Sequence, residues 1–128
     1  MSRKTTARNA GNVVRKFYAA FERKDVAAAR RLLDDKLYFK GPFDTFHNAD
    51  DYLQALGKLS QIVTRLDVKK IFSERNDASV FFELETKAPA SATTLVAERH
   101  RVENGKISRV EAVFDPRPFE AMFGGAKR

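Results

Sequence analysis

Segment 93–103 carries a glutamate and a histidine two residues apart, Glu98 and His100. Alternate residues of a β-strand point to the same side, so in a strand both side chains would share one face. A carboxylate beside an imidazole is a common proton-transfer arrangement, because histidine titrates near neutral pH. The pair predicts either an acid–base or substrate-contacting site, or a structural pair satisfied by a tyrosine, a serine or water.

The rest of the chain offers few other routes to chemistry. It has no cysteine, which excludes disulfides, thiolate catalysis and cysteine-based zinc or iron–sulfur sites. Its two histidines, His47 and His100, are too few for a multi-histidine metal site. No glycine-rich phosphate loop or nucleophile elbow occurs. We therefore expect no cofactor and no metal, and we expect His47 to be an exposed loop residue.

The formal net charge of +7 lies mainly at the two ends of the 128-residue chain. Five of the 24 lysines and arginines fall within residues 1–8 and 124–128, where there is no acidic residue. A nucleic-acid-binding surface would instead gather its basic residues on one face of the folded body. We expect flexible basic tails over 1–8 and 124–128, one folded domain over 9–123, and no nucleic-acid partner.

Hydropathy points to a protein that stays in the cytoplasm. No apolar run approaches the roughly 18 residues that a membrane-spanning helix needs. No apolar segment of the kind found in secretory signals follows Met1. We therefore expect no membrane association and a cytoplasmic location.

Three helices are predicted before most of the strands. Apolar residues at helical spacing mark 12–23, with Asn9 or Asn12 as its cap, and a short helix over 26–33 begins after Asp25. A third helix over 50–63 follows Asn48, with Asp51 completing a capping pair. The buried stripe of the third helix is Tyr52, Leu53, Leu56, Leu59 and Val63.

The strands follow from alternation and turn residues. The predicted strands are 37–43, 66–74, 78–87, 93–103 and 106–115, and an apolar turn over 116–123 closes the chain. This order predicts a single α+β domain in which three helices lie against one face of a curved antiparallel sheet.

Strand parity places Glu98 and His100 on the inner face. On 78–87 the apolar even positions face inward, which leaves Glu83 and Glu85 outside to pair with Arg99 and Arg101 of the next strand. The even positions of 93–103 then also face inward. The predicted inner residues of these two strands are Val80, Phe82, Leu84, Thr86, Thr94, Val96, Glu98, His100 and Val102.

The register of the last strand depends on its turn. A two-residue turn at Asn104-Gly105 would bury Ile107, Arg109, Glu111 and Val113, whereas a three-residue loop with a bulge at Gly105 would bury Ser108, Val110, Ala112 and Phe114. We favour the second register, because the first buries two charged side chains at a large desolvation cost.

These features together resemble the nuclear transport factor two-like superfamily, and within it the SnoaL-like and ketosteroid-isomerase-like proteins. The resemblance rests on the helix order, the VVRKFYAAFERKD opening, the strand before Gly41-Pro42, the VENGKI hairpin and the FDP ending, and it covers about residues 10–118. It implies a cone in which a curved sheet encloses an apolar pocket, and a homodimer formed through the convex face. The outer positions Phe81, Leu95, Ala97 and Val113 are apolar enough to support that dimer.

The family's catalytic roles transfer only in part. The general-base aspartate of ketosteroid isomerase falls at Gly41, its oxyanion-hole tyrosine at Phe17, and its protonated aspartate at or near Glu98. Glu98 with His100 is similar in kind to the acid–base pair of SnoaL-like cyclases, whereas the Asp-Arg-Asp set of limonene epoxide hydrolases is not evident.

The resemblance implies one pocket with two possible uses. The chain is either a cofactor-free enzyme acting on an apolar small molecule, with Glu98 and His100 as acid and base, or a non-catalytic module that binds a ligand or a protein. Tyr18 and Tyr52 are either core residues or hydrogen-bond donors to a ligand. The residues expected to line the pocket are Phe17, Tyr18, Phe21, Phe39, Tyr52, Leu56, Phe82, Leu84, Val110 and Phe114.

Overall fold

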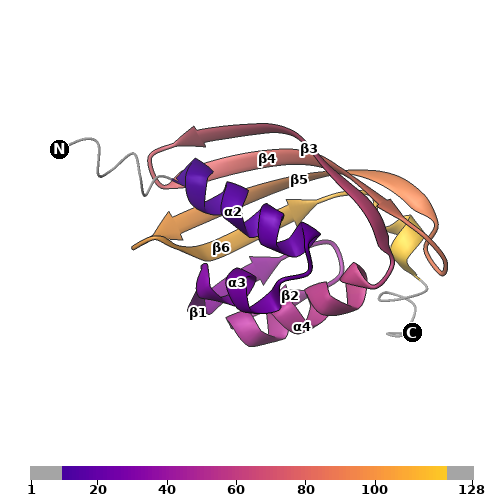
Figure 1. Ribbon diagram of the computed structural model, residues 1–128, viewed down its shortest axis with the longest axis horizontal. Coiled ribbons are helices and arrows are strands. Elements are labelled where there is room, and N and C mark those ends of the chain that lie inside the picture. Colours follow the sequence, from indigo (N-terminus) through magenta and orange to yellow (C-terminus); the bar gives the residue numbers. More distant parts are fainter. Residues whose placement is uncertain (1–9, 121–128) are drawn as a thin grey trace.

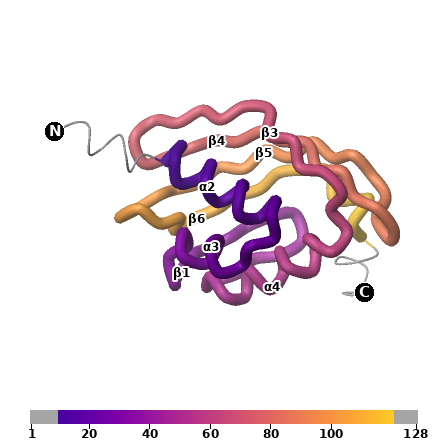
Figure 2. Tube along the Cα trace, in the orientation of Figure 1, coloured from indigo at the N-terminus to yellow at the C-terminus, as the bar shows by residue number. Residues whose placement is uncertain are grey.

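Three helices lie over one face of a curved sheet (Figure 1). The computed structural model describes residues 10–120, so the predicted tails over 1–8 and 124–128 lie outside the described residues. Figure 2 shows the longest helix, α2 (Ala10–Glu22), running across the concave side of the sheet. The helices are α2 (Ala10–Glu22), α3 (Val26–Arg31) and α4 (Ala49–Ser60).

The sheet has six strands in the order β2-β1-β6-β5-β4-β3. The predicted α+β class and curved sheet are confirmed, with one difference: β1 runs parallel to β6, so the sheet is mixed. The chain leaves β1, builds α4 and three long strands, and returns beside β1 in the same direction. The strands are β1 (Leu33–Lys40), β2 (Thr45–Phe46), β3 (Val63–Glu74), β4 (Asp77–Thr86), β5 (Ala92–Glu103) and β6 (Lys106–Val113), followed by the 3-10 helix η1 (Arg117–Phe119).

Two of the predicted helix caps are confirmed. The Asp25 side chain accepts a hydrogen bond from the Ala28 amide at 3.0 Å, and the Asn48 side chain accepts one from the Asp51 amide at 2.8 Å. These bonds satisfy amides that have no partner within the helix. At α2 the helix begins at Ala10 and encloses Asn12, so Asn12 is not its cap, and the other predicted cap, Asn9, lies outside the described residues.

The second and third helices both end sooner than predicted, because the residues that follow them form strands of the sheet. The short helix stops at Arg31, and the carbonyl of Leu32 accepts a hydrogen bond from the Ile107 amide at 2.8 Å, which starts β1 at Leu33. The third helix ends at Ser60, and Val63 begins β3. In both places apolar residues at helical spacing continue beyond the last helical residue, which is why the predicted helices were too long.

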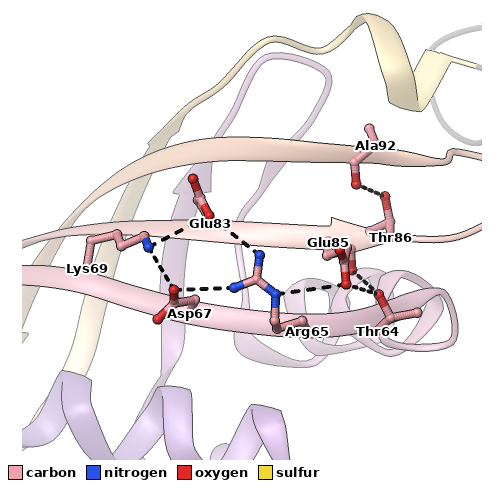
Figure 3. A network of polar contacts seen from close by, with 8 residues as sticks. All are labelled: Thr64, Arg65, Asp67, Lys69, Glu83, Glu85, Thr86 and Ala92. Atoms are coloured by element: carbon pink, nitrogen blue, oxygen red, sulfur yellow. Dashed lines mark hydrogen bonds and ion pairs between the residues drawn. The ribbon is translucent and has the colours of Figure 1, made fainter.

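The predicted inner face of β4 and β5 is confirmed, whereas the predicted ion-pair partners on the outer face are wrong. Glu83 and Glu85 lie opposite Leu95 and Thr93 of β5, so no arginine of β5 stands across from them. Figure 3 shows them contacting Arg65 of β3 instead, with nitrogen–oxygen distances of 3.5 and 3.9 Å. The arginines of β5 pair with other acidic residues.

The β5–β6 hairpin combines the two predicted alternatives. Asn104 and Gly105 both have positive φ angles, 54° and 77°, and form the two-residue turn, so the predicted three-residue loop is wrong. Ile107 is buried opposite Val102, and a bulge at Ser108 then shifts the register by one residue. The favoured inner positions from Val110 onward are therefore correct, and the charged positions stay outside.

Candidate functional site

An apolar cavity of about 90 Å³ lies between α2, α4 and the concave side of β3–β5. Inner positions of strands and one face of each helix converge on it, because both must bury their apolar side chains. The predicted pocket residues that line it are Phe17, Tyr18, Phe21, Tyr52, Leu56, Phe82, Leu84 and Phe114, together with Glu98. The prediction missed Leu59, Leu66, Val96 and Phe119.

Two predicted pocket residues lie elsewhere. Phe39 lines a neighbouring hollow beside the end of β1. Val110 is fully buried and lines neither hollow, because its register places it beside His100, deeper in the core. Parity identifies the inner face of a strand, but it does not identify which inner positions stay uncovered. The missed Leu66 and Val96 follow that same parity, whereas nothing in the sequence marked Phe119 of η1.

Glu98 is the acidic residue that lines the cavity, and its side chain is 12% exposed. The Tyr18 hydroxyl of α2 donates a short hydrogen bond to Glu98 Oε1. His100 Nε2 lies 3.2 Å from the same oxygen and 3.0 Å from the Tyr18 hydroxyl oxygen. Among the described residues, both contacts to the carboxylate therefore use Oε1, which leaves Oε2 for a ligand.

His100 shares the inner face with Glu98 as predicted, but it does not reach the cavity. Its side chain is fully buried behind the Tyr18 ring, with ring centroids 5.7 Å apart and nearly perpendicular. Nδ1 of His100 has no hydrogen-bond partner among residues 10–120. A hydrogen on Nδ1 would have no acceptor there, so the geometry favours the tautomer with its hydrogen on Nε2. His100 thus donates toward Glu98 and Tyr18.

The two buried tyrosines keep their protons at neutral pH. Burial, and then the negative charge and hydrogen bond of Glu98, hold the pKa of the Tyr18 hydroxyl well above its ordinary value. Burial and the nearby Glu98 charge do the same to the pKa of Tyr52. Each hydroxyl is therefore a hydrogen-bond donor in the site. Tyr52 stacks on Phe17 and Phe39, which fixes its ring over the cavity.

The other candidate positions contribute less. His47 is exposed in the loop before α4, as predicted, and its ring lies 5.6 Å from that of Tyr38. Gly41 follows the last residue of β1 and offers no side chain at the position where the resemblance places the ketosteroid isomerase base. The described part of the chain holds no group of three or more potential metal ligands. Within that same part, no helix has the length and apolar character to cross a membrane.

Comparisons with known proteins agree on the fold. The SnoaL-like domain family matches residues 14–110. No curated protein matches the sequence. A solved structure from Kribbella flavida has 22% identity and a TM-score of 0.81, over 88% of this chain and 91% of that chain.

Two further solved structures are similar. A candidate ketosteroid isomerase from Kribbella flavida has 16% identity and a TM-score of 0.74, over 83% of this chain and 77% of that chain. An LEH-like epoxide hydrolase from M. tuberculosis has 19% identity and a TM-score of 0.73, over 97% of this chain and 95% of that chain. At these identities the likeness shows a shared fold.

Proposed function

The chain belongs to the SnoaL-like domain family, within the nuclear transport factor two-like superfamily, and on that premise we propose that it is a cofactor-free acid–base enzyme. Its substrate is an apolar small molecule, and Glu98 is the group that moves the proton. One observation carries this proposal: a carboxylate lines a mostly apolar cavity, with Oε1 held by Tyr18 and His100 and with no hydrogen bond to Oε2 from residues 10–120.

Each polar residue has a distinct part in the proposal. Glu98 Oε2 takes a proton from the substrate or from water and returns it to another atom. Tyr18 and His100 contact the carboxylate through Oε1, so we assign both a positioning role, in place of the acid–base role predicted for His100 from the sequence. Tyr52 donates a hydrogen bond to a polar atom of the substrate. Fixing a catalytic group in advance lowers the cost of reaching the transition state.

A non-catalytic binding module is the second candidate. The observation in its favour is that Tyr18 and His100 satisfy Glu98 Oε1, as they would in a purely structural triad. In that case the cavity would hold an apolar ligand without changing it.

Turnover of two small probes separates the candidates. The similar structures include a candidate ketosteroid isomerase and an LEH-like epoxide hydrolase, so the probes are but-3-enal, for isomerisation to but-2-enal, and 1,2-epoxybutane, for hydrolysis. Glu98→Gln keeps the shape of the side chain and removes its basicity. Glu85→Gln, on the outer face of β4, is the matched control.

We expect the protein to convert at least one probe, with the rate lowered about 100-fold or more in Glu98→Gln and unchanged in Glu85→Gln. Conversion that is equal in both variants would contradict the assignment of Glu98. Binding of both probes without conversion would favour the binding module.

The proposal includes a homodimer formed through the convex face. Phe81, Ala97 and Val113 lie opposite one another across β4, β5 and β6. Val113 is 69% exposed, and Leu95, two residues from Ala97 on the same face, is 61% exposed. Such a band of apolar side chains is stabilised when a second surface covers it.

A further inference from the structure

A second hollow of about 110 Å³ lies beside the first, between α4 and the β1–β2 hairpin. It is lined from one side by residues of the hairpin and from the other by α4. The two hollows share five lining residues: Tyr52, Leu56, Leu59, Glu98 and Phe114. Glu98 and Tyr52 are the polar members of this shared set, so the hydrogen-bonding groups lie where the two hollows meet.

The walls beyond the shared residues are mostly apolar in both directions. Toward β3–β5, the first hollow is bounded by Leu66, Phe82, Leu84 and Val96. Toward the hairpin, the second is bounded by Phe39, Pro42, Phe43 and Phe46, with Asp44 as its charged member. Each hollow therefore suits a hydrocarbon group, and the junction suits an oxygen-bearing group.

The volumes limit the length of each hydrocarbon group. A cavity of about 150 Å³ in another protein holds one benzene ring, so hollows of 90 and 110 Å³ each hold about four carbon atoms. A ligand with its polar group at one end could place a hydrocarbon chain in only one of the two hollows while its polar group contacts Glu98. A ligand with its polar group in the middle could fill both hollows.

We propose that the two hollows join at Glu98 to form one site for an elongated apolar molecule that carries its hydroxyl or carbonyl group near the middle of the chain. This inference rests on the proposed small-molecule site and specifies its substrate class. Glu98 Oε2 accepts from a hydroxyl group, and the Tyr52 hydroxyl donates to an oxygen, so an alcohol engages both residues at once.

Isomeric alcohols test the position of the polar group. Nonan-5-ol and nonan-1-ol have the same atoms, but only nonan-5-ol carries a four-carbon arm on each side of its hydroxyl. We expect titration calorimetry on the full chain to show nonan-5-ol binding at least tenfold more tightly, with one molecule per chain. Equal affinities, or two molecules per chain, would overturn the inference by showing that a wall separates the hollows.

Filling either hollow should weaken the binding of nonan-5-ol. Val96→Phe narrows the first hollow, and Ala55→Leu narrows the second. Ala19→Leu, at an exposed position of α2, is the matched control and should bind like the unmodified protein. Ala112→Val, a smaller change in the second hollow, replaces Ala55→Leu if that variant does not fold. Unchanged affinity in a folded variant of either hollow would overturn the inference.

Results that contradict the joined site can be told apart from results that contradict the proposed enzymatic function. In Glu98→Gln the amide oxygen takes the place of Oε1, where Tyr18 and His100 donate to it, and the amide NH2 faces the junction and donates to the alcohol oxygen. The preference for nonan-5-ol should therefore survive although proton transfer is lost. A protein that prefers nonan-5-ol and converts no probe contradicts only the enzyme. A protein that converts a probe and binds both alcohols equally contradicts only the joined site.

Discussion

At Glu98, donors from two separate elements meet on one carboxylate oxygen. Tyr18 comes from α2 and His100 from β5, and neither group is exposed to solvent beyond a few per cent. Hydrogen bonds to a charged acceptor in such surroundings are stronger than those between neutral groups. Oε2 of the same carboxylate, to which residues 10–120 make no hydrogen bond, is therefore held in a fixed direction.

Strand alternation was enough to place Glu98 and His100 on one face, but the partner from α2 could not be foreseen. The resemblance to ketosteroid isomerase placed a helix tyrosine at Phe17, whereas the hydroxyl that reaches Glu98 belongs to Tyr18. Helical spacing puts both residues on the buried side of α2. The rotation of the helix over the sheet decides which of them meets β5, and a single sequence does not contain that rotation.

The raised pKa values of Tyr18 and Tyr52 predict a loss of stability in alkali. Tyrosines in the unfolded chain lose their protons near pH 10, whereas these two hold theirs to higher pH in the folded state. Their contribution to the free energy of unfolding is thus complete below about pH 10 and falls above it, by up to about 1.4 kcal/mol per pH unit for each tyrosine.

Urea unfolding between pH 8 and pH 11 measures this effect. Tyr18→Phe removes one of the two groups, so the free energy of unfolding should fall less steeply with pH in that variant than in the unmodified protein. Parallel curves for the two proteins would show that Tyr18 titrates alike in the folded and unfolded chains, and would contradict the assignment.

Among the elements, the β5–β6 hairpin shows what pattern and turn chemistry each contribute. The burial pattern correctly favoured Val110 and Phe114 as inner residues, and the Asn104-Gly105 pair correctly signalled a tight turn. The two signals conflicted because they differ by one residue in register. The structure reconciles them with a bulge at Ser108, whose hydroxyl donates to the Arg101 carbonyl at 3.3 Å. A bulge adds one residue to one strand, and no residue type announces it here.

The parallel pairing of β1 with β6 also could not be predicted from the sequence pattern. Alternation marks a strand and its faces, but it does not identify the neighbour of that strand or their relative direction. Here the neighbours are separated along the chain by α4 and four strands. This pairing places the end of β1 beside the cavity, and with it the second hollow.

Two glycines provide a matched test of the hairpin. Gly105 has a φ of +77°, a conformation that costs a residue with a Cβ about 1–2 kcal/mol. Gly105→Ala should therefore lower the free energy of unfolding by about 1 kcal/mol. Gly57→Ala, in the exposed middle of α4 with no atom close to the added Cβ, should raise it by up to about 1 kcal/mol. Chemical denaturation measures both, and changes of the same sign would contradict the assigned turn.

For the molecule as a whole, the apolar band on the convex face predicts the assembly. Phe72 and Phe81 form an edge-to-face pair at 6.3 Å, and Phe72 is 56% exposed. We expect sedimentation to show a dimer at micromolar concentration, because exposed apolar side chains extend across neighbouring strands of this face. Leu95→Lys and Val113→Lys should each shift the protein toward monomer, since a buried unpaired charge is costly.

The matched control for the dimer lies on α3. Val26→Lys replaces another exposed valine, 62% accessible, on the helical side of the molecule. It should leave the sedimentation coefficient unchanged. A monomer at micromolar concentration in the unmodified protein would exclude the proposed homodimer, while leaving the site within each chain as it is.

If Glu98 moves protons to and from a bound apolar molecule, as we propose, hydrogen–deuterium exchange measures that movement itself. Butan-2-one is incubated in D₂O with the protein, and nuclear magnetic resonance follows the loss of its C–H signals beside the carbonyl. We predict exchange well above that in buffer alone, lost about 100-fold or more in Glu98→Gln and retained in Glu85→Gln. Exchange at the same rate in Glu98→Gln and in the unmodified protein would contradict the claim.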